Sequence, residues 1–197
     1  MLKSQRARPH LGDRLAFFRE FLKHPQQVAS IVPSSRFLER RVVEVADVRS
    51  ARAVVELGAG TGGVTRAILA AMPRDAQLLS VEINPRFRTS LERIGDSRLI
   101  AYTGGAGELE RAISLHGLAA PDVVISGIPF SKMKRDSASH VLQMISTVLA
   151  AGGRFVAYQL HKRVESLCRP LLGPAQVELE LRNIPPLRIY RWQKHAA

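Results

Sequence analysis

From residue 53 onward, hydrophobic positions along the chain alternate between two spacings. Short apolar runs rich in Val, Ile and Leu have the composition of buried β-strands. Between them, apolar residues recur every three or four positions, as in an amphipathic helix. The predicted strands are 53–57, 78–82, 98–102, 122–126 and 153–159, and the predicted helices are 64–72, 85–94, 107–116, 137–150 and 162–169. This alternation predicts an α/β fold with a parallel, doubly wound sheet.

The two ends of the chain depart from this alternation. Near the C-terminus, two strand-like runs, 176–181 and 187–192, are joined through Asn183-Ile184-Pro185-Pro186, which predicts an antiparallel hairpin. At the N-terminus, residues 1–10 have the composition of a basic arm, and 11–23 and 26–47 carry helical patterns. We therefore expect a basic arm and amphipathic helices over 1–45, followed by one domain over 46–197.

The segment 11–23 is basic and amphipathic. Its apolar face carries Leu11, Leu15, Phe18 and Leu22, and the flanking or opposite positions carry Arg14, Arg19 and Lys23. A helix of this kind either packs on the core of its own domain or lies in a membrane interface. The basic surplus of the whole chain favours membrane contact.

The net charge of the chain is +12, with a pI near 11.0. Residues 1–41 hold nine basic and three acidic residues, so this fifth of the chain carries half of the excess. Such a charge indicates an anionic partner, either nucleic acid or an anionic membrane surface. Few aromatic residues are interleaved with the basic ones, so no base-stacking platform is evident and nucleic acid is the less favoured partner.

The remaining composition concerns where the protein works. Cys168 is the only cysteine, so no intrachain disulfide is possible, and a reducing cytoplasm is consistent with this. No run reaches the roughly 18 apolar residues of a membrane-spanning helix, and no secretory signal is seen. We expect a cytoplasmic protein that is peripheral on the inner face of the cell membrane, with no bound metal ion.

The segment from Val54 to Gly63 is a strand that ends in an acid and turns through glycines into a helix. Glycines allow both the turn and the close approach of a nucleotide-like ligand at a helix N-terminus. Gly58, Gly60 and Gly63 also satisfy the G-x-G-x-x-G spacing of dinucleotide sites, so glycines alone do not decide. Glu56 favours a cationic ligand over a pyrophosphate, and the pattern resembles motif I of class I S-adenosylmethionine-dependent methyltransferases.

A second nucleotide signal lies one strand later. The run Leu78 to Val81 reads as a strand and ends at Glu82, which is 20 residues after Gly62. This is the spacing expected of an acid that binds ribose hydroxyls. Ile83 would then lie against the adenine face.

The third motif is the end of the predicted strand 122–126, where Ser126 leads into Gly127-Ile128-Pro129-Phe130. A proline near a strand end is common, so the motif gains meaning only after the glycine-rich turn. In class I methyltransferases this strand end faces the transferred methyl group, so we expect an acceptor pocket here. Its predicted lining is Ser126, Pro129 and Phe130, with Tyr190 closing it. Candidates for removing the acceptor's proton are Tyr158, His161 and Tyr190, with His140 behind them, and a core or surface role is the alternative for each.

The chain resembles the small bacterial phospholipid N-methyltransferases, a branch similar to the rRNA adenine dimethyltransferases. The segments that carry the resemblance are Phe21 to Pro25, Ala29 to Ser35, Glu56 to Gly62, Val81 to Pro85, Ser126 to Phe130 and Arg182 to Arg191. The resemblance implies the class I fold: a doubly wound, Rossmann-like, seven-stranded sheet with N-terminal helices and a C-terminal antiparallel hairpin. It implies methylation of phosphatidylethanolamine toward phosphatidylcholine, with an N-terminal helix docked on the membrane; an rRNA adenine dimethyltransferase-like activity is the alternative.

The resemblance also implies the cofactor contacts. S-adenosylmethionine is expected to be bound by Ser34, Ser35, Glu56, Gly58, Ala59, Gly60, Thr61, Gly62, Glu82, Ile83, Ala106 and Ser126. Two positions depart from the adenine dimethyltransferases. Gly127 stands where those enzymes have an Asn that holds the adenine amine of the acceptor, which counts against a nucleobase acceptor. Residues 103–107 lack the acid that usually meets the cofactor's adenine, so backbone groups or Glu108 must hold it.

Overall fold

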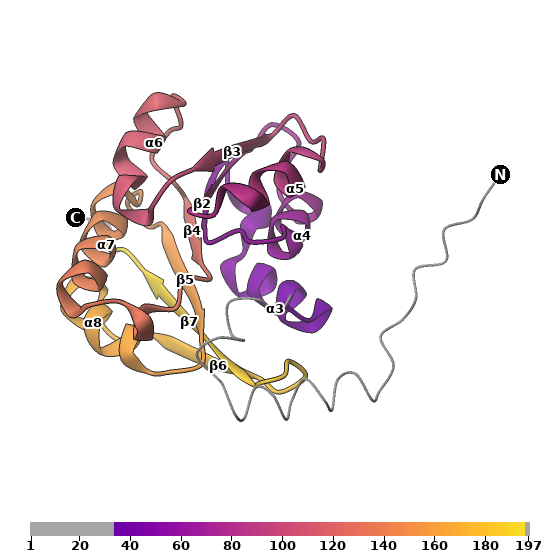
Figure 1. Ribbon diagram of the computed structural model, residues 1–197. Coiled ribbons are helices and arrows are strands. Elements are labelled where there is room, and N and C mark those ends of the chain that lie inside the picture. The colour runs from indigo at the N-terminus through magenta and orange to yellow at the C-terminus, as the bar shows by residue number, and fades with distance from the viewer. Residues whose placement is uncertain (1–33, 196–197) are drawn as a thin grey trace. The chain divides into compact units, whose positions relative to one another are not determined.

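The computed structural model describes residues 34–195, which contain a seven-stranded mixed sheet (Figure 1). The strands are β1 (Ala53–Leu57), β2 (Gln77–Glu82), β3 (Leu99–Thr103), β4 (Val123–Ser126), β5 (Arg154–Gln159), β6 (Gln176–Glu180) and β7 (Leu187–Gln193). Their order is β3-β2-β1-β4-β5-β7-β6. Strands β1 to β5 are parallel, whereas β7 runs antiparallel to both β5 and β6. The predicted Rossmann-like doubly wound sheet with a C-terminal hairpin is confirmed.

The central strands are buried on both faces. Every residue of β1 and of β4 is buried. This explains why the sequence shows continuous apolar runs there, because a parallel strand covered on both sides has no polar face. Strand β6 lies at the edge of the sheet, and Glu180 is its only buried residue.

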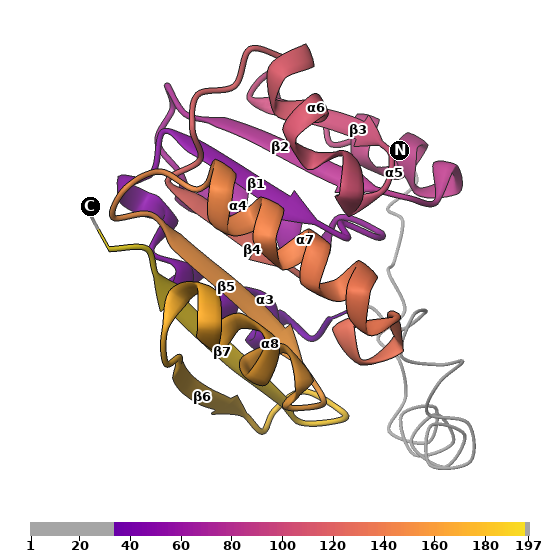
Figure 2. The same cartoon turned by 90° about the vertical axis from the view of Figure 1, so that its left-hand side faces the viewer.

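Helices cover both faces of the sheet (Figure 2). Those on one face include α3 (Arg36–Ala46) and α4 (Gly63–Ala71), and those on the other are α6 (Leu109–Leu115), α7 (Arg135–Val148) and α8 (Arg163–Leu172). The short helix α5 (Arg88–Glu92) contacts β3. Alternate residues of each strand therefore serve different core clusters: Val55 and Leu57 face α6 to α8, whereas Val54 faces α3 and α4.

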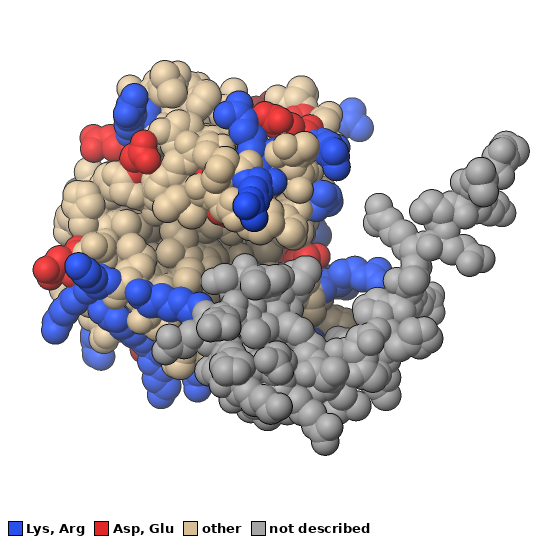
Figure 3. All heavy atoms as spheres, in the orientation of Figure 1, with Lys and Arg blue, Asp and Glu red and all other residues tan. Residues whose placement is uncertain are grey.

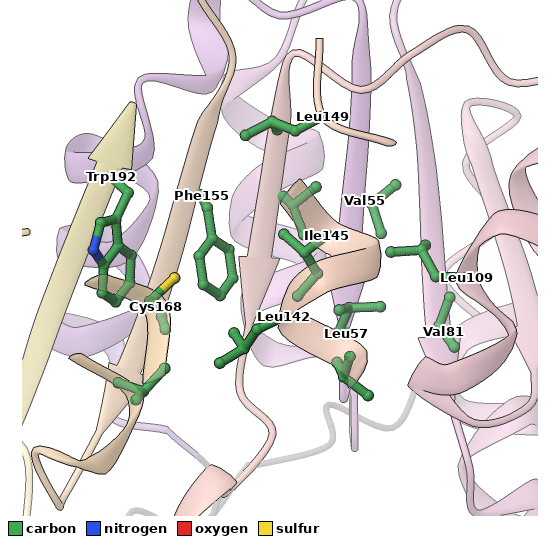
Figure 4. Packing of buried hydrophobic residues seen from close by; sticks show 14 of the residues in the cluster. Val55, Leu57, Val81, Leu109, Leu142, Ile145, Leu149, Phe155, Cys168 and Trp192 are labelled. Carbon is green, nitrogen blue, oxygen red and sulfur yellow. The ribbon is translucent and has the colours of Figure 1, made fainter. Parts of the chain in front are cut away.

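The core on the α6 to α8 side is close-packed aliphatic and aromatic (Figure 4). Val55 and Leu57 of β1 and Ile145 of α7 are all fully buried in it. At the β7 end, the rings of Phe155 and Trp192 stack with centroids 5.1 Å apart. This packing fixes the end of the sheet to which the hairpin adds its two strands.

Several N-terminal predictions fall outside the described residues. The basic arm 1–10, the helix 11–23 and the first part of the pattern 26–47 are among them, and the division of the chain near residue 45 stays a prediction. Helix α3 begins after Ser35, whose hydroxyl accepts a hydrogen bond from the backbone N–H of Leu38 at 3.2 Å. Among the helices of residues 34–195, none combines the length and apolar character needed to cross a membrane.

Helix α3 is tied to the C-terminal hairpin. The backbone N–H of Ser35 donates to the Asn183 side-chain oxygen at 3.0 Å, and the Asn183 amide donates to the Pro185 carbonyl at 2.8 Å. Arg41 forms an ion pair with Glu178 of β6. Asn183 is buried away from water, so its side-chain amide is satisfied by these two hydrogen bonds within the protein. The segments around Ser35 and Asn183, far apart in sequence, therefore form one structural unit.

Candidate functional site

Three motif segments meet at one edge of the sheet. In the strand register, Leu57 of β1 pairs with Val81 of β2 and with Ser126 of β4. The parallel strands therefore end side by side, and the loops that follow them lie next to each other (Figure 2). In an open α/β sheet, the carboxyl edge of the strands is where ligands bind.

The glycine loop after β1 depends on left-handed backbone. Gly58, Gly60 and Gly62 have φ angles of +82°, +53° and +81°, a region that residues with a Cβ rarely adopt. Around the missing Cβ of Gly60 there is open space, with no heavy atom within 4 Å. The Gly60 N–H donates to the Glu82 carboxylate at 2.8 Å. The loop thus leaves room for a ligand at Gly60 and connects directly to the end of β2.

Glu56 lies beneath this loop and is almost completely buried. One carboxylate oxygen, Oε2, accepts hydrogen bonds from the hydroxyls of Thr65 at 2.6 Å and Ser80 at 2.7 Å. The other oxygen, Oε1, is buried without a partner among the described residues. Burial raises the pKa of Glu56 from 4.5 to about 7; the two hydroxyls oppose that rise, and the neighbouring Glu82 adds to it. An unpartnered buried carboxylate oxygen is a ready acceptor for a cationic group.

Glu56→Gln should remove a pH dependence of stability. Because the pKa of Glu56 is raised from 4.5 to about 7 in the folded chain, the folded state keeps a proton that the unfolded state has lost. This contribution is full at low pH, falls as the pH rises between those two values, and is constant above them. Relative to wild type, the amide variant should therefore gain about 2 to 3 kcal/mol of stability between roughly pH 5 and pH 8.

Denaturant unfolding at the two pH values measures this gain. Exposed Glu110 on α6 offers a matched control, because Glu110→Gln removes a carboxylate without touching the buried pair of hydroxyls. An equal difference between Glu56→Gln and wild type at both pH values would contradict the assignment of a protonated buried carboxyl.

Glu82 and Ile83 occupy the positions expected of a nucleoside site. Glu82 is buried; its Oε2 accepts from Gly60 and its Oε1 accepts from the backbone N–H of Asn84 at 2.9 Å. Ile83 is 75% exposed, although it follows a buried strand directly. A carboxylate held in place by two backbone N–H groups suits the hydroxyls of a ribose, and an exposed isoleucine beside it suits the apolar face of the attached base.

The loop after β3 holds Ala106 and Glu108. Ala106 is partly buried and begins a short 3-10 turn. The Glu108 carboxylate accepts from the Gly105 N–H at 2.9 Å and from the Tyr102 hydroxyl at 3.2 Å. Glu108 therefore stabilises the turn itself, and adenine recognition by this loop falls to its backbone groups.

Glu39 of α3 lies beside the glycine loop, and the sequence did not single it out. Its carboxylate lies against Gly63, the first residue of α4, where a Cβ would overlap it. Burial raises the pKa of Glu39, while Arg66 and Arg36 act in the opposite direction. The sequence could have indicated Glu39 only through its helical spacing, because it lies three residues before the buried Val42 and so next to the buried face of α3. With Glu56 and Glu82, it places three carboxylates around the loop, and Arg66 and Arg36 lie close to Glu39.

The loop after β4 is anchored to the end of β5. Ser126 is fully buried, and its hydroxyl accepts from the Ile128 N–H at 3.3 Å. The Ile128 carbonyl accepts from the side-chain amide of Gln159 at 2.7 Å. Pro129 is exposed at the surface beyond this anchor. Gln159, which the sequence did not single out, thus sets the position of the predicted acceptor loop.

Tyr158 fills the space that a side chain at position 127 would occupy. A Cβ on Gly127 would overlap the Tyr158 hydroxyl and lie 2.7 Å from its ring carbon Cζ. Burial raises the pKa of the Tyr158 hydroxyl above its ordinary value, and the carboxylates of Glu56, Glu39 and Glu82 raise it further. Tyr158 is therefore a neutral hydroxyl near the cluster of acids, and a raised pKa disfavours its ionisation as a base; its role in proton removal stays a prediction.

Two predicted pocket residues belong to the core instead. Phe130 is fully buried in the cluster facing α6 to α8, and so is Tyr190, whose ring stacks on Trp192 at 5.7 Å. The two placements have a common physical cause. Aromatic residues near strand ends supply large apolar area, and the sheet uses these two against its helices. Acceptor contact by either side chain stays a prediction.

The remaining predicted residues lie at or near the carboxyl edge. His161 is exposed just after β5, Thr61 is exposed in the glycine loop, and Ala59 is buried there. Ser34 and Ser35 are partly buried at the start of α3. His140, on α7, is exposed. Cofactor contact by Ser34, Ser35, Ala59 and Thr61, and proton removal by His161, stay predictions.

One relative is similar over nearly the whole chain. It is the ornithine lipid N-methyltransferase of Singulisphaera acidiphila, 29% identical over 183 residues that cover 91% of this chain and 95% of the relative. A second is the ribosomal RNA small subunit methyltransferase A of Maricaulis maris, 34% identical over 97 residues. That match covers 48% of this chain and only 32% of the relative. No protein family model matches the chain.

Solved structures share the fold. The N-methyltransferase NodS from Bradyrhizobium japonicum superimposes with a TM-score of 0.66 at 12% identity, covering 81% of this chain and 97% of NodS. The Burkholderia thailandensis 1,6-didemethyltoxoflavin-N1-methyltransferase, solved with S-adenosylhomocysteine, gives a TM-score of 0.65 at 15% identity and covers 97% and 93%. The chain has the fold of the class I S-adenosylmethionine-dependent methyltransferases.

The geometry of the site suits S-adenosylmethionine, the cofactor of the proteins that share this fold. The open side of Gly60 gives the backbone room to approach a ligand, and exposed Ile83 beside Glu82 suits the nucleoside. The unpartnered oxygen of Glu56 and the neighbouring Glu39 suit the positive charge of the methionine part. Dinucleotide binding, the alternative left open by the glycine spacing, would bring a pyrophosphate against these carboxylates. The fold, the acids and the loop thus agree on one cofactor.

Proposed function

We propose that this methyltransferase transfers methyl groups to the primary amine of a membrane lipid head group, with phosphatidylethanolamine methylated toward phosphatidylcholine. The observation that carries the proposal is the packing of Tyr158 over Gly127. The position where an adenine methyltransferase has its amide side chain is here a glycine covered by a neutral hydroxyl. Such a group accepts or donates one hydrogen bond, which suits a small alkylamine better than the edge of a base.

The ornithine lipid N-methyltransferase supports a lipid acceptor, because it matches this chain almost from end to end. Ornithine lipid and phosphatidylethanolamine share a primary amine on a lipid head group. The comparison therefore supports the kind of acceptor more strongly than the particular lipid. We take phosphatidylethanolamine as the acceptor and treat ornithine lipid as the second arm of the test.

The reaction asks mainly for placement and exclusion of water. Bound S-adenosylmethionine supplies an electrophilic methyl group on a sulfonium. Glu82 and the Gly60 backbone would hold its ribose, and Glu56 its ammonium. Ser126 to Pro129, anchored by Gln159, would form the acceptor side, with the Tyr158 hydroxyl as a hydrogen-bond partner of the amine. His161, exposed after β5, would take the amine proton, or bulk water would receive it directly.

An rRNA adenine methyltransferase is the second candidate. The partial similarity to the Maricaulis rRNA methyltransferase and the net charge of +12 favour it. The absence of a side chain at Gly127 counts against it, because the adenine amine would lose its specific partner. The two candidates differ in acceptor and not in cofactor, so one assay separates them.

The test uses the purified full chain with S-adenosylmethionine labelled in its methyl group. Phosphatidylethanolamine, ornithine lipid and small-subunit rRNA are offered separately, the lipids in detergent micelles. We expect label in phosphatidylethanolamine, with successive products carrying one to three methyl groups. Label in ornithine lipid alone would move the proposal to that head group. Label in rRNA and in neither lipid would overturn it.

A further inference from the structure

Exposed apolar side chains of the described residues are concentrated on the C-terminal hairpin, on both of its faces, and at the neighbouring start of α3. Within residues 34–195, seven large apolar side chains are exposed, and five of them lie on the first turn of α3, on β6 or in the β6–β7 turn. Four of these are near the turn: Phe37, Leu179, Leu181 and Ile184, which are 48%, 55%, 67% and 37% exposed. We call these four residues the apolar rim. Solvent-exposed apolar side chains gathered in this way mark an interaction surface more often than isolated ones do.

The apolar rim lies at the same edge of the sheet as the methyl-transfer site. Arg188, near the start of β7, pairs with Gln159 at the end of β5, so the β6–β7 turn sits where the parallel strands end (Figure 2). The hydrogen bond from Ser35 to Asn183 brings the start of α3, and with it Phe37, to the same turn. An acceptor that reaches the β4 loop must therefore approach past this edge.

Cationic side chains accompany the apolar rim. The Arg182 guanidinium lies 4.5 Å from the ring centre of Phe37, and Arg188 shares a face of the hairpin with Leu179. Arg36 and Lys162 are exposed nearby in the fold, at the start of α3 and just after β5. Figure 3 shows Lys and Arg side chains gathered over the region of α8. Apolar groups flanked by cations have the composition of a surface that binds anionic lipid head groups and enters the interface.

We infer that the apolar rim, with Arg36, Arg182 and Arg188, is the surface on which the enzyme rests on an anionic bilayer. This rests on the proposed lipid acceptor and adds the orientation of the enzyme. The site edge faces the bilayer, and the head-group amine enters beside the hairpin without leaving the interface. RNA would use the cations but gain nothing from exposed leucines. The alternative is that residues 1–33 of the chain cover the apolar rim in place of a bilayer.

The test compares two full-length variants. Leu179→Ser/Leu181→Ser removes two exposed leucines of the apolar rim, and Leu115→Ser removes a 65% exposed leucine at the end of α6. Partition is measured by flotation with vesicles of phosphatidylcholine and phosphatidylglycerol. We expect the double variant to bind vesicles at least about tenfold more weakly, because two apolar contacts are lost. Leu115→Ser should bind like wild type.

Four further readouts separate the possible failures. Unfolding midpoints and cofactor affinity should be unchanged in both variants, since the leucines are exposed and outside the cofactor site. Methyl transfer to phosphatidylethanolamine in detergent micelles tests the proposed function without a bilayer. Wild-type vesicle binding by the double variant would overturn the inference and assign the apolar rim to packing within the chain, even if micellar transfer is intact. If the double variant no longer shifts rRNA in a gel but still binds vesicles, the inference would be wrong, and the apolar rim would belong to a nucleic-acid surface.

Discussion

Gly60→Val is expected to lower the affinity for S-adenosylmethionine by at least about 100-fold. Gly60 has a φ of +53°, its N–H donates to Glu82, and no heavy atom lies within 4 Å of where its Cβ would be. A branched side chain would fill that open space, where the cofactor must come close to the backbone. It would also strain the left-handed backbone at a cost of about 1 to 2 kcal/mol. Calorimetry with the cofactor measures the first effect, and chemical unfolding the second.

Gly117→Val separates ligand exclusion from backbone strain. Gly117 has a φ of +61° and an equally open surrounding, but it follows α6 and precedes β4, at the opposite edge of the sheet. It should show a similar loss of stability and an unchanged cofactor affinity. If both variants bind the cofactor like wild type, Gly60 does not face the ligand, and the assignment of the loop is wrong.

The periodicity of the chain predicted the fold well because the fold depends on burial. The central strands read as continuous apolar runs, and helices on both faces of the sheet account for them. Helix α8 extended beyond its predicted end at residue 169, through Pro170 to Leu172. A proline in the last turn of a helix loses one hydrogen bond, and the burial of Leu172 offsets that loss. Element ends, unlike element types, depend on such balances.

The cofactor side of the site could be predicted for a similar reason. Gly58, Gly60 and Glu82 act through local backbone geometry and through a fixed position at a strand end, and both leave a pattern in the sequence. The structure places them together as that pattern requires. Their contacts with the cofactor stay predictions.

The acceptor side could not be predicted in the same way, because it depends on contacts between distant segments. Gln159 reaches the Ile128 carbonyl, and Asn183 reaches Ser35 across 148 positions of sequence. Phe130 looked like a pocket residue only because it follows a proline at a strand end. Whether such a ring turns toward the ligand or the core depends on which helix covers the strand, and α7 and α8 cover this one.

The contact between Gly127 and Tyr158 has the same long-range character, and it decides what position 127 can hold. Sequence reasoning attributed acceptor choice to the missing Asn alone. In the structure, the tyrosine already fills that space, so an amide cannot simply be restored. The acceptor site is thus defined by two residues together: Gly127 has no side chain, and the hydroxyl of the half-buried Tyr158 occupies the space that a side chain there would need.

Gly127→Asn should therefore reduce methyl transfer to phosphatidylethanolamine by at least about 100-fold without creating transfer to rRNA. The new side chain displaces Tyr158 from the end of β4, and misplacement of an acceptor by about 1 Å costs a factor of this size. Affinity for the cofactor should change less than turnover, because the glycine loop is untouched. The overlap should also lower the free energy of unfolding by about 1 to 3 kcal/mol.

A double-mutant cycle tests the cause. Gly127→Ala should destabilise the wild-type background but cost much less in Tyr158→Leu, where neither the hydroxyl nor the ring carbon Cζ remains to overlap the new Cβ. Tyr158→Phe keeps the ring, so it should relieve only part of the overlap while removing the hydroxyl that we assign to the amine. Additive losses of stability would show that the two residues do not compete for space. Transfer to rRNA by Gly127→Asn would show that position 127 alone selects the acceptor, and the role given to Tyr158 would then be wrong.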